Sequence, residues 1–552
     1  MVRKKVNNLS ISPKKIDLNV ETIRIDSRFS TLKVILIFCL FFFISHDFLE
    51  AEEYFRLNPI DNKITYRANL LNLQKLDINH LIYKHNFESD HFMFPFTSYN
   101  TFIKALTTFT TSKSSDDSFI DYQVVDETVS GRLQVNIGGG VDYHTDFDEY
   151  YVHPYRRVRI RGNIFNRLVF WGDWWAGRFQ GDLNYAECTS PLLNRWHKSH
   201  ELPGQTYTNL NSLSGQISYF FDFGNVSLGR GTHQVGDNIG GSIILNDAVN
   251  DYGYFSSKIV FGKLQLTFLH GSLIPNERDP IYSDPYDGVL RYVDKFFSQH
   301  QVNYQPFTNL ELFFGEQVIY ANRSVDISYL LPHTFYRIIE HNLHDRDNML
   351  IYAGGRWLVN ENLTLYGNLA LDELRKSEIF GNWWGNKYAL QGGFSLKYLP
   401  GFISKDNKPI RTTFEMTAVR PWTYTHKSYH TNTSHDGVGL GFPEGSNLIQ
   451  GATQTELTIL PYLGFNFFTS YIRQGSWGNC WSLNYTKDRM VNGELLDTAK
   501  WFEGDITNTF RSKGVFALSI LAHHSVNLGI DLTKQSDKDW LKELIFSYEF
   551  MY

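Results

Sequence analysis

The sequence contains few of the features that mark disulfide-rich proteins, helical membrane proteins or nucleic-acid-binding proteins. Cysteine occurs 3 times in 552 residues, which excludes a dense disulfide framework. The formal net charge of −6 excludes a strongly basic surface for nucleic acid. The longest apolar run, residues 34–44, is shorter than the ~20 residues that a transmembrane helix requires. Cys188 and Cys480 lie beyond this run and can either pair in an oxidising compartment or remain free thiols.

The apolar run has the length and the basic flank of a secretory signal, so we expect export through the inner membrane. Residues 1–51 are predicted to form this signal, with a long basic region before the apolar one. Residues 52–130 are expected to form a short periplasmic helical segment and a linker, because their leucines recur near helical spacing. In the remainder, residues 131–552, apolar residues recur at every second position.

A period of two predicts β-strands with two unlike faces. In NLTLYGNLALDEL, residues 362–374, leucines occupy one face and polar or small residues the other. A soluble β-sandwich shows the same alternation, but the final residues, LIFSYEFMY, form an apolar and aromatic stripe typical of the closing strand of an outer-membrane barrel. We therefore predict an all-β fold, a large transmembrane antiparallel β-barrel of about 16–20 strands, with about 18 as the expected number.

Five stretches resemble segments of a known protein family. They are RANLLNLQKLDINHLIYKH (residues 67–85), NVSLGRGTHQVGDNIGGSIILND (225–247), EQVIYANRSVDISYLLPHTFY (316–336), HDRDNMLIY followed by LYGNLALDEL (with Asp347, Asn348 and Asp372), and RPWTYTHKSYHTNTSHDGVGLGFPEGSN (420–447). Their order resembles that of the Wzi-like capsule-assembly outer-membrane proteins, over about residues 60–552. The resemblance implies an integral outer-membrane barrel that holds surface polysaccharide.

The last of these stretches contains three histidines, His426, His430 and His435, at spacings compatible with a helix. A metal site is one interpretation, but Pro421 and the glycines that follow His435 prevent a helix through this region. We expect a polar outer loop or an insert in the barrel lumen, with no metal and no cofactor. Within it, Tyr424 and His426 are candidates either for hydrogen bonding to a sugar or for fixing the loop.

A basic row follows from the same alternation in YRRVRIRGN, where Arg157, Arg159 and Arg161 share one face. Because the opposite face is apolar and suits lipid, we expect the arginines to point into the lumen. One interpretation is a charge network with lumenal carboxylates, for which Asp142, Asp372 and Glu415 are the candidates. The other is a stripe selective for anions, such as an acidic glycan or small solutes.

Doubled tryptophans occur at Trp174 and Trp175 and again at Trp383 and Trp384, next to Asp173 and Asn382. Flat aromatic rings beside polar groups suit the stacking of sugars. Interfacial aromatic girdles of outer-membrane barrels use the same residue types. We hypothesise that at least one of the two pairs stacks on a sugar, helped by polar groups near Tyr424 and His426.

No catalytic pattern of the G-x-S-x-G, H-E-x-x-H or phosphate-loop type occurs. We therefore expect a non-enzymatic, lectin-like protein that assists assembly or surface retention of capsular or extracellular polysaccharide. The alternative is an outer-membrane porin or specific channel for small anionic or sugar solutes. The expected partners are surface polysaccharide, outer-membrane lipid and the machinery that inserts outer-membrane barrels, and no nucleic acid.

Overall fold

The computed structural model describes residues 120–125, 130–165, 167–190, 207–275, 292–344, 346–378, 381–398, 410–460, 462–491, 493–521, 523–536 and 538–552. The predicted signal, residues 1–51, and the predicted helical segment up to residue 119 lie outside the described residues. Within the predicted linker, Ile120–Val125 forms a strand, β1, which pairs with the beginning of β2.

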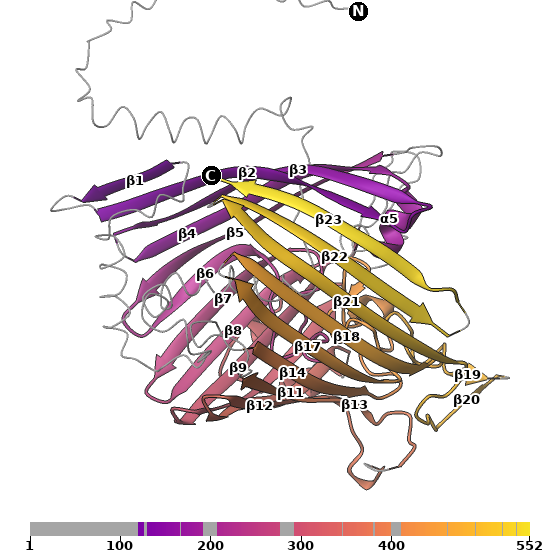
Figure 1. Ribbon diagram of the computed structural model, residues 1–552. Helices are drawn as coiled ribbons and strands as arrows, with labels where there is room; N and C mark the ends of the chain where they lie inside the picture. The colour runs from indigo at the N-terminus through magenta and orange to yellow at the C-terminus, as the bar shows by residue number, and fades with distance from the viewer. Residues whose placement is uncertain are drawn as a thin grey trace, which may run out of the picture. The chain divides into compact units, whose positions relative to one another are not determined.

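The described chain forms a closed antiparallel barrel of 18 strands, with β1 added at one edge of β2 (Figure 1). The barrel strands are β2 (Ser130–Thr145), β3 (Tyr150–Ile164), β4 (Leu168–Gly181), β5 (Tyr207–Phe221), β6 (Gly224–Gly231), β7 (Tyr252–Phe261), β8 (Leu264–Leu273), β9 (Lys295–Phe307), β10 (Leu310–Ala321), β11 (Asn348–Asn360), β12 (Leu363–Glu373), β13 (Lys387–Tyr398), β14 (Ile410–Val419), β17 (Leu448–Leu460), β18 (Leu463–Gly475), β21 (Ile506–Leu521), β22 (His524–Gln535) and β23 (Leu541–Met551). Each strand pairs with the next along the chain, and β23 closes the barrel on β2. The predicted fold class and strand number are confirmed.

The two faces of the wall differ as the alternation predicts. On β13, Gln391 faces the lumen and is buried, whereas Leu390 and Phe394 face outward and are 47% and 40% exposed. Large exposed apolar side chains recur on the outer face of most strands. Such a surface is stable against lipid and unfavourable in water. None of the described helices is long and apolar enough to cross a bilayer.

The two ends of the barrel carry different connections. The end that holds the C-terminus has short turns, such as those at residues 222–223 and 308–309. The opposite end carries long loops, among them residues 232–251, 322–347 and 420–447. In outer-membrane barrels the short turns are periplasmic and the long loops are extracellular. We therefore call the long-loop end the outer end.

Short elements lie within these connections. They are α5 (Leu183–Thr189), η2 (Ile327–Leu330), α7 (Tyr336–Asn342), η3 (Lys376–Glu378), η4 (Tyr429–Thr431), and the small hairpins β15–β16 (Ser434–His435 and Val438–Gly439) and β19–β20 (Met490–Val491 and Glu494–Leu495). The hairpin β19–β20 belongs to the connection that also contains Cys480. Cys480 is a free thiol, with its Sγ 2.9 Å from Ser482 Oγ.

Candidate functional site

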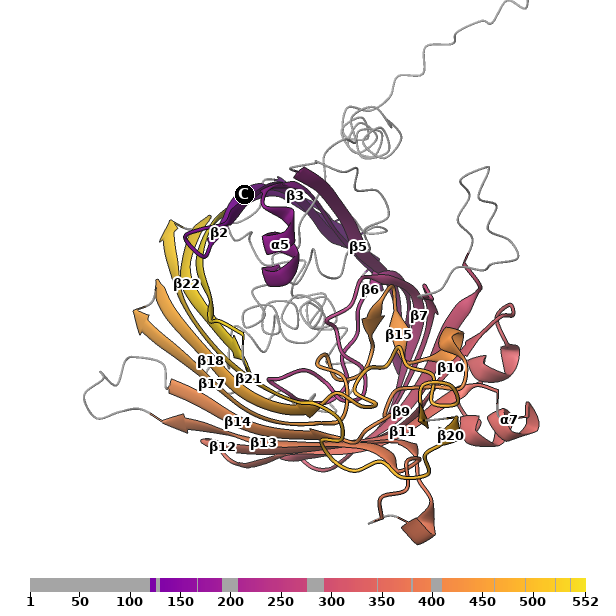
Figure 2. The same cartoon turned by 90° about the vertical axis from the view of Figure 1, so that its right-hand side faces the viewer.

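Two outer loops fold back into the lumen beside β7–β14 (Figure 2). Residues 232–251 form the β6–β7 loop, and residues 420–447 form the β14–β17 loop. Ile243 and Phe442, one from each loop, are fully buried in a single apolar cluster. Asn246 Nδ2 donates to the carbonyl of Gly439 at 2.9 Å, which ties one loop to the other. Together the loops form a small core inside the barrel.

Glu415 on β14 anchors the β6–β7 loop to the wall. Its carboxylate accepts hydrogen bonds from Ile239 N at 2.9 Å, from Gly240 N at 2.8 Å and from the Tyr366 hydroxyl at 2.7 Å. A Cβ on Gly240 would lie 2.2 Å from Gln450 Oε1, so a larger residue here would have to displace the Gln450 side chain. Charge-assisted bonds to backbone N–H groups are strong, so the loop is held against the lumenal face of β14.

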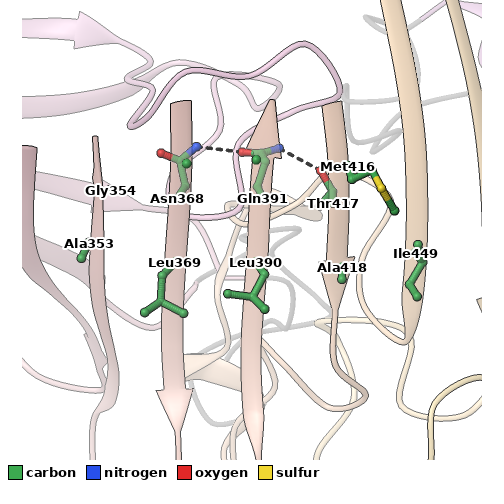
Figure 3. A pocket seen from close by; sticks show the side chains of 12 residues that line it. Ala353, Gly354, Asn368, Leu369, Leu390, Gln391, Met416, Thr417, Ala418 and Ile449 are labelled. Atoms are coloured by element: carbon green, nitrogen blue, oxygen red, sulfur yellow. Dashed lines mark hydrogen bonds between the residues drawn. The ribbon is translucent and has the colours of Figure 1, made fainter. Parts of the chain in front are cut away.

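A polar row on the same wall holds this loop at further points. Asn368, Gln391 and Thr417 form a hydrogen-bonded chain across β12, β13 and β14 (Figure 3). Gln391 Nε2 also donates to Gly241 O at 2.7 Å, and Asn368 Nδ2 to Asp237 O at 2.8 Å. The pocket in Figure 3 is lined on the outward side of these strands by apolar residues, including the exposed Leu390 and Met416. That outward side suits lipid and not a hydrophilic ligand.

The three histidines lie in the β14–β17 loop, which forms an insert in the lumen, one of the two arrangements expected from the sequence. His426 Nδ1 is 2.5 Å from Thr431 Oγ1, and His435 Nδ1 accepts from Ile274 N at 3.0 Å. Burial lowers the pKa of His426 and of His435 to about 3, so both rings are neutral at physiological pH. In the described part of the chain, no group of three or more His, Cys, Asp or Glu side chains could hold a metal ion.

Tyr424 and His426 contribute to the packing of this loop. Tyr424 is 1% exposed; its hydroxyl donates to Ile243 O at 2.7 Å and its N–H to Asp372 Oδ2 at 2.7 Å. Of the two predicted roles, this geometry matches fixing the loop. The His426 ring is also buried, and its edge faces Tyr485 at a centroid distance of 6.1 Å.

The pair at Trp174 and Trp175 is divided by the barrel wall. Successive strand residues point to opposite faces, so Trp175 is 3% exposed on the lumenal side while Trp174 faces outward on β4. Trp175 packs with α5, which lies inside the ring of strands (Figure 2). Trp174 and Trp175 therefore lie on opposite faces of β4, and the hypothesis that at least one of the two pairs stacks on a sugar now rests on Trp383 and Trp384.

The other pair lies together in the β12–β13 connection at the outer end. Trp383 and Trp384 are partly exposed, with ring centroids 5.8 Å apart. Trp384 packs on Tyr485 at 4.8 Å, and Arg489 Cζ lies 3.9 Å from its ring centroid. Trp384 N donates to Asp497 O. We call Trp383, Trp384, Tyr485 and His426 the outer aromatic cluster. Tyr485 and Arg489 were missed in the sequence because no local pattern distinguishes them.

Arg157, Arg159 and Arg161 share the lumenal face of β3, and their acidic partners differ from those expected. Arg157 donates to both carboxylate oxygens of Asp173 on β4, at 2.8 and 2.6 Å, and Arg159 donates to the same group at 3.2 Å. Glu549 on β23 lies 3.4 Å from Arg157. Arg161 lies on the same face of β3. Asp173 lies on the adjacent strand β4, whereas Glu549 lies on β23, which β2 separates from β3.

The three carboxylates proposed for the basic row are engaged elsewhere. Asp372 pairs with Lys387 at 2.8 Å, Asp142 lies 3.5 Å from His153 Nδ1, and Glu415 holds the β6–β7 loop. The arginines of the basic row do take part in a charge network, but its carboxylates are Asp173 and Glu549.

A closed barrel with an apolar outer surface and a polar interior is the architecture of integral proteins of the bacterial outer membrane. This chain is such a protein, and the predicted localisation is confirmed. No family model and no curated protein matches the chain.

Solved structures of similar architecture come from two kinds of outer-membrane protein. One is Wzi of Escherichia coli, a carbohydrate-binding β-barrel involved in group 1 capsule assembly, with 11% identity, a TM-score of 0.47, and coverage of 75% of this chain and 84% of that one. Others are OccAB4 of Acinetobacter baumannii (8%, TM-score 0.42, 76% and 98%) and OprD of Pseudomonas aeruginosa (9%, 0.40, 80% and 99%). These likenesses concern the architecture and assign no function.

Proposed function

We propose that the chain is a non-enzymatic, lectin-like outer-membrane protein that assists assembly or surface retention of capsular or extracellular polysaccharide. The outer aromatic cluster is the observation that carries the proposal. Trp383 and Trp384 present partly exposed rings at the outer end, held in place by Tyr485 and Arg489. Rigid aromatic faces beside a few fixed polar groups are what a sugar-binding surface needs.

Charge near the outer aromatic cluster supports an acidic glycan as the ligand. Arg375 Cζ lies 4.1 Å from the Trp383 ring centroid, and Arg375 is exposed. Lys427, next to His426, and Lys487, which lies over Tyr429, are exposed as well. Exposed cations raise the local concentration of an anionic polymer and steer its approach.

The inward loops favour retention of a polymer over conduction of solutes. A lectin has no need of an open lumen, whereas a porin depends on one. The β6–β7 and β14–β17 loops bury apolar side chains against each other and are bonded to the wall at Glu415 and Gln391. Because these loops are fixed, they fill the part of the lumen beside β7–β14, which supports the lectin-like function over an open channel.

Replacing both Trp383 and Trp384 by alanine should release polysaccharide from the cell surface into the medium. Aromatic stacking contributes about 0.5–1.5 kcal/mol for each ring, so we expect binding of purified polysaccharide to weaken by about tenfold. The measurements are the polysaccharide in cells and in medium, and the affinity of the purified protein for the extracted polymer.

Trp174→Ala is the matched control, because it removes a tryptophan from the outward face of β4. Both variants should still migrate faster unheated than boiled, as folded barrels do. If the W383A/W384A protein folds and retains and binds polysaccharide like the parent, the outer aromatic cluster is not a glycan site.

The second candidate is a porin or specific channel for small anionic or sugar solutes. The specific observation in its favour is the lumenal row of Arg157, Arg159 and Arg161 on β3. Rings or stripes of arginine on a pore wall favour anions. In this chain Asp173 neutralises part of that charge by its bidentate pair with Arg157.

Two further partners are proposed from the wall itself. The outward apolar side chains fit outer-membrane lipid. The final strand, β23, presents the outward residues Phe546 and Tyr548 and closes on β2. We propose that the barrel insertion machinery recognises this strand.

A further inference from the structure

The connection between β10 and β11 does not enter the lumen, unlike the loops described above. Residues 322–344 fold over the outward face of the wall, and Figure 2 shows α7 outside the ring of strands next to β10. The side chains of β10 alternate, so Glu316 shares the outward face with Phe314. Tyr336 N donates to Glu316 Oε2 at 2.7 Å, and the Tyr336 ring lies 4.2 Å from the ring of His300 on β9. The segment thus covers polar groups on the outward side of the strands.

This outer segment, residues 322–344, has a fixed structure of its own. Arg323 makes a bidentate pair with Asp347, at 2.8 and 2.7 Å, and the Tyr329 hydroxyl donates to the same carboxylate at 2.8 Å. Tyr329 and Tyr336 are fully buried in an apolar cluster that includes Val318 of β10. The ion pair between Arg323 and Asp347 connects the beginning of the segment to the residue that precedes β11. Both ends of the segment are therefore held together.

The surface that the outer segment presents away from the wall is apolar to an unusual degree. Five of its large apolar side chains are between 40% and 74% exposed: Val325, Ile327, Leu331, Phe335 and Ile338. For residues of this size, such exposure in water is unfavourable.

The exposed charges of the outer segment are of one sign. Glu340 is buried beneath Arg337 with its carboxylate 2.6 Å away, and Asp326 is half-buried against Arg323. Arg337, His333 and His341 are exposed. Among the described residues of the segment, the exposed ionisable side chains are therefore arginine and histidine, and neither carboxylate is exposed.

We propose that the outer segment lies in the outer leaflet and binds lipopolysaccharide, the phosphorylated and acylated lipid of that leaflet. Its apolar side chains would lie among acyl chains, and Arg337 and the histidines beside phosphate groups, as in interfacial helices. Continuity with the lipid-facing wall supports this occupant. On the periplasmic side of the outer segment, the wall itself exposes the outward residues Val302 and Phe314, which are 37% and 46% exposed. The proposal is independent of glycan binding at the outer aromatic cluster.

Site-specific photo-crosslinking of the full-length protein in living cells tests this proposal. A benzophenone amino acid replaces Phe335 or Ile338, one at a time, and adducts are detected with antibody against lipopolysaccharide. We expect lipopolysaccharide adducts at both positions. Phe223 is the matched control: it is an exposed phenylalanine in the β5–β6 turn at the periplasmic end, where lipopolysaccharide is absent from the leaflet.

A second measurement uses purified protein and added lipopolysaccharide. The parent should gain resistance to heat-induced unfolding, and the Phe335→Glu/Ile338→Glu variant should lose at least half of that gain, whereas Phe223→Glu should keep it. Adducts to a second copy of the chain or to another protein at Phe335 and Ile338 would overturn the proposal and identify a protein interface. A gain in heat resistance that the double variant fully retains would also overturn it.

Discussion

Replacing Glu415 by alanine should detach the β6–β7 loop from the barrel wall while the barrel itself stays closed. The substitution removes the acceptor for two backbone N–H groups and one tyrosine hydroxyl. Each buried donor left without a partner costs about 1–3 kcal/mol. Water that enters the lumen offsets part of this loss, so we expect a net effect near ~2 kcal/mol, which corresponds to hydrogen exchange about 30-fold faster at Ile239 and Gly240.

Hydrogen exchange followed by mass spectrometry measures this effect directly, and limited proteolysis within residues 232–251 reports the same release. Glu456→Ala is the matched control, because Glu456 is a carboxylate on the neighbouring strand β17 that pairs with Arg411. If exchange in the β6–β7 loop is the same in the Glu415→Ala protein as in the Glu456→Ala protein, Glu415 does not hold the loop.

Deleting the last three residues, Phe550 to Tyr552, should abolish assembly of the folded barrel. Phe550 and Met551 pair with Gly139 and Gly138 of β2, and Tyr552 exchanges two backbone hydrogen bonds with Ile137, at 2.8 and 2.9 Å. Without them, the edges of β2 and β22 are left unpaired where lipid offers no hydrogen bonds, at a cost of several kcal/mol for each group. The measurement is the fraction of protein that migrates faster unheated than boiled.

Tyr552→Phe is the control for this deletion, because it keeps the backbone and the ring and removes only the hydroxyl that lies 2.7 Å from His524 Nε2. It should assemble like the parent. A truncated protein that still reaches the outer membrane in the same amount and the same heat-modifiable form would show that β23 needs no complete pairing with β2.

The barrel and the faces of its strands could be predicted from the sequence because both depend on local periodicity. Leu390 and Gln391 differ in burial as successive strand residues must. The lumenal direction of Arg157 followed from the same rule. That rule also places Trp174 and Trp175 on opposite faces of the wall, so these neighbours in the sequence are not neighbours in space.

Other features depend on contacts that no local pattern encodes. The choice of Asp173 as partner of Arg157 follows from the pairing register of β3 with β4, in which Arg157 lies opposite Trp175 and Arg159 opposite Asp173. The outer aromatic cluster joins residues about a hundred positions apart, Trp384 and Tyr485, through the packing of two outer loops. The outward folding of residues 322–344 depends likewise on long-range contacts, here with Glu316 and His300.

Conductance in a planar lipid bilayer tests the proposed lectin-like function most directly, because it separates a barrel that holds polysaccharide from one that passes solutes. The β6–β7 and β14–β17 loops, bonded to each other through Asn246 and to the wall through Glu415, lie within the ring of strands beside β7–β14. We predict that the purified full-length protein inserts and gives negligible current in potassium chloride at moderate voltage. Stable, stepwise openings with anion selectivity that weakens in Arg157→Gln or Arg159→Gln variants would contradict the lectin-like function and establish the channel.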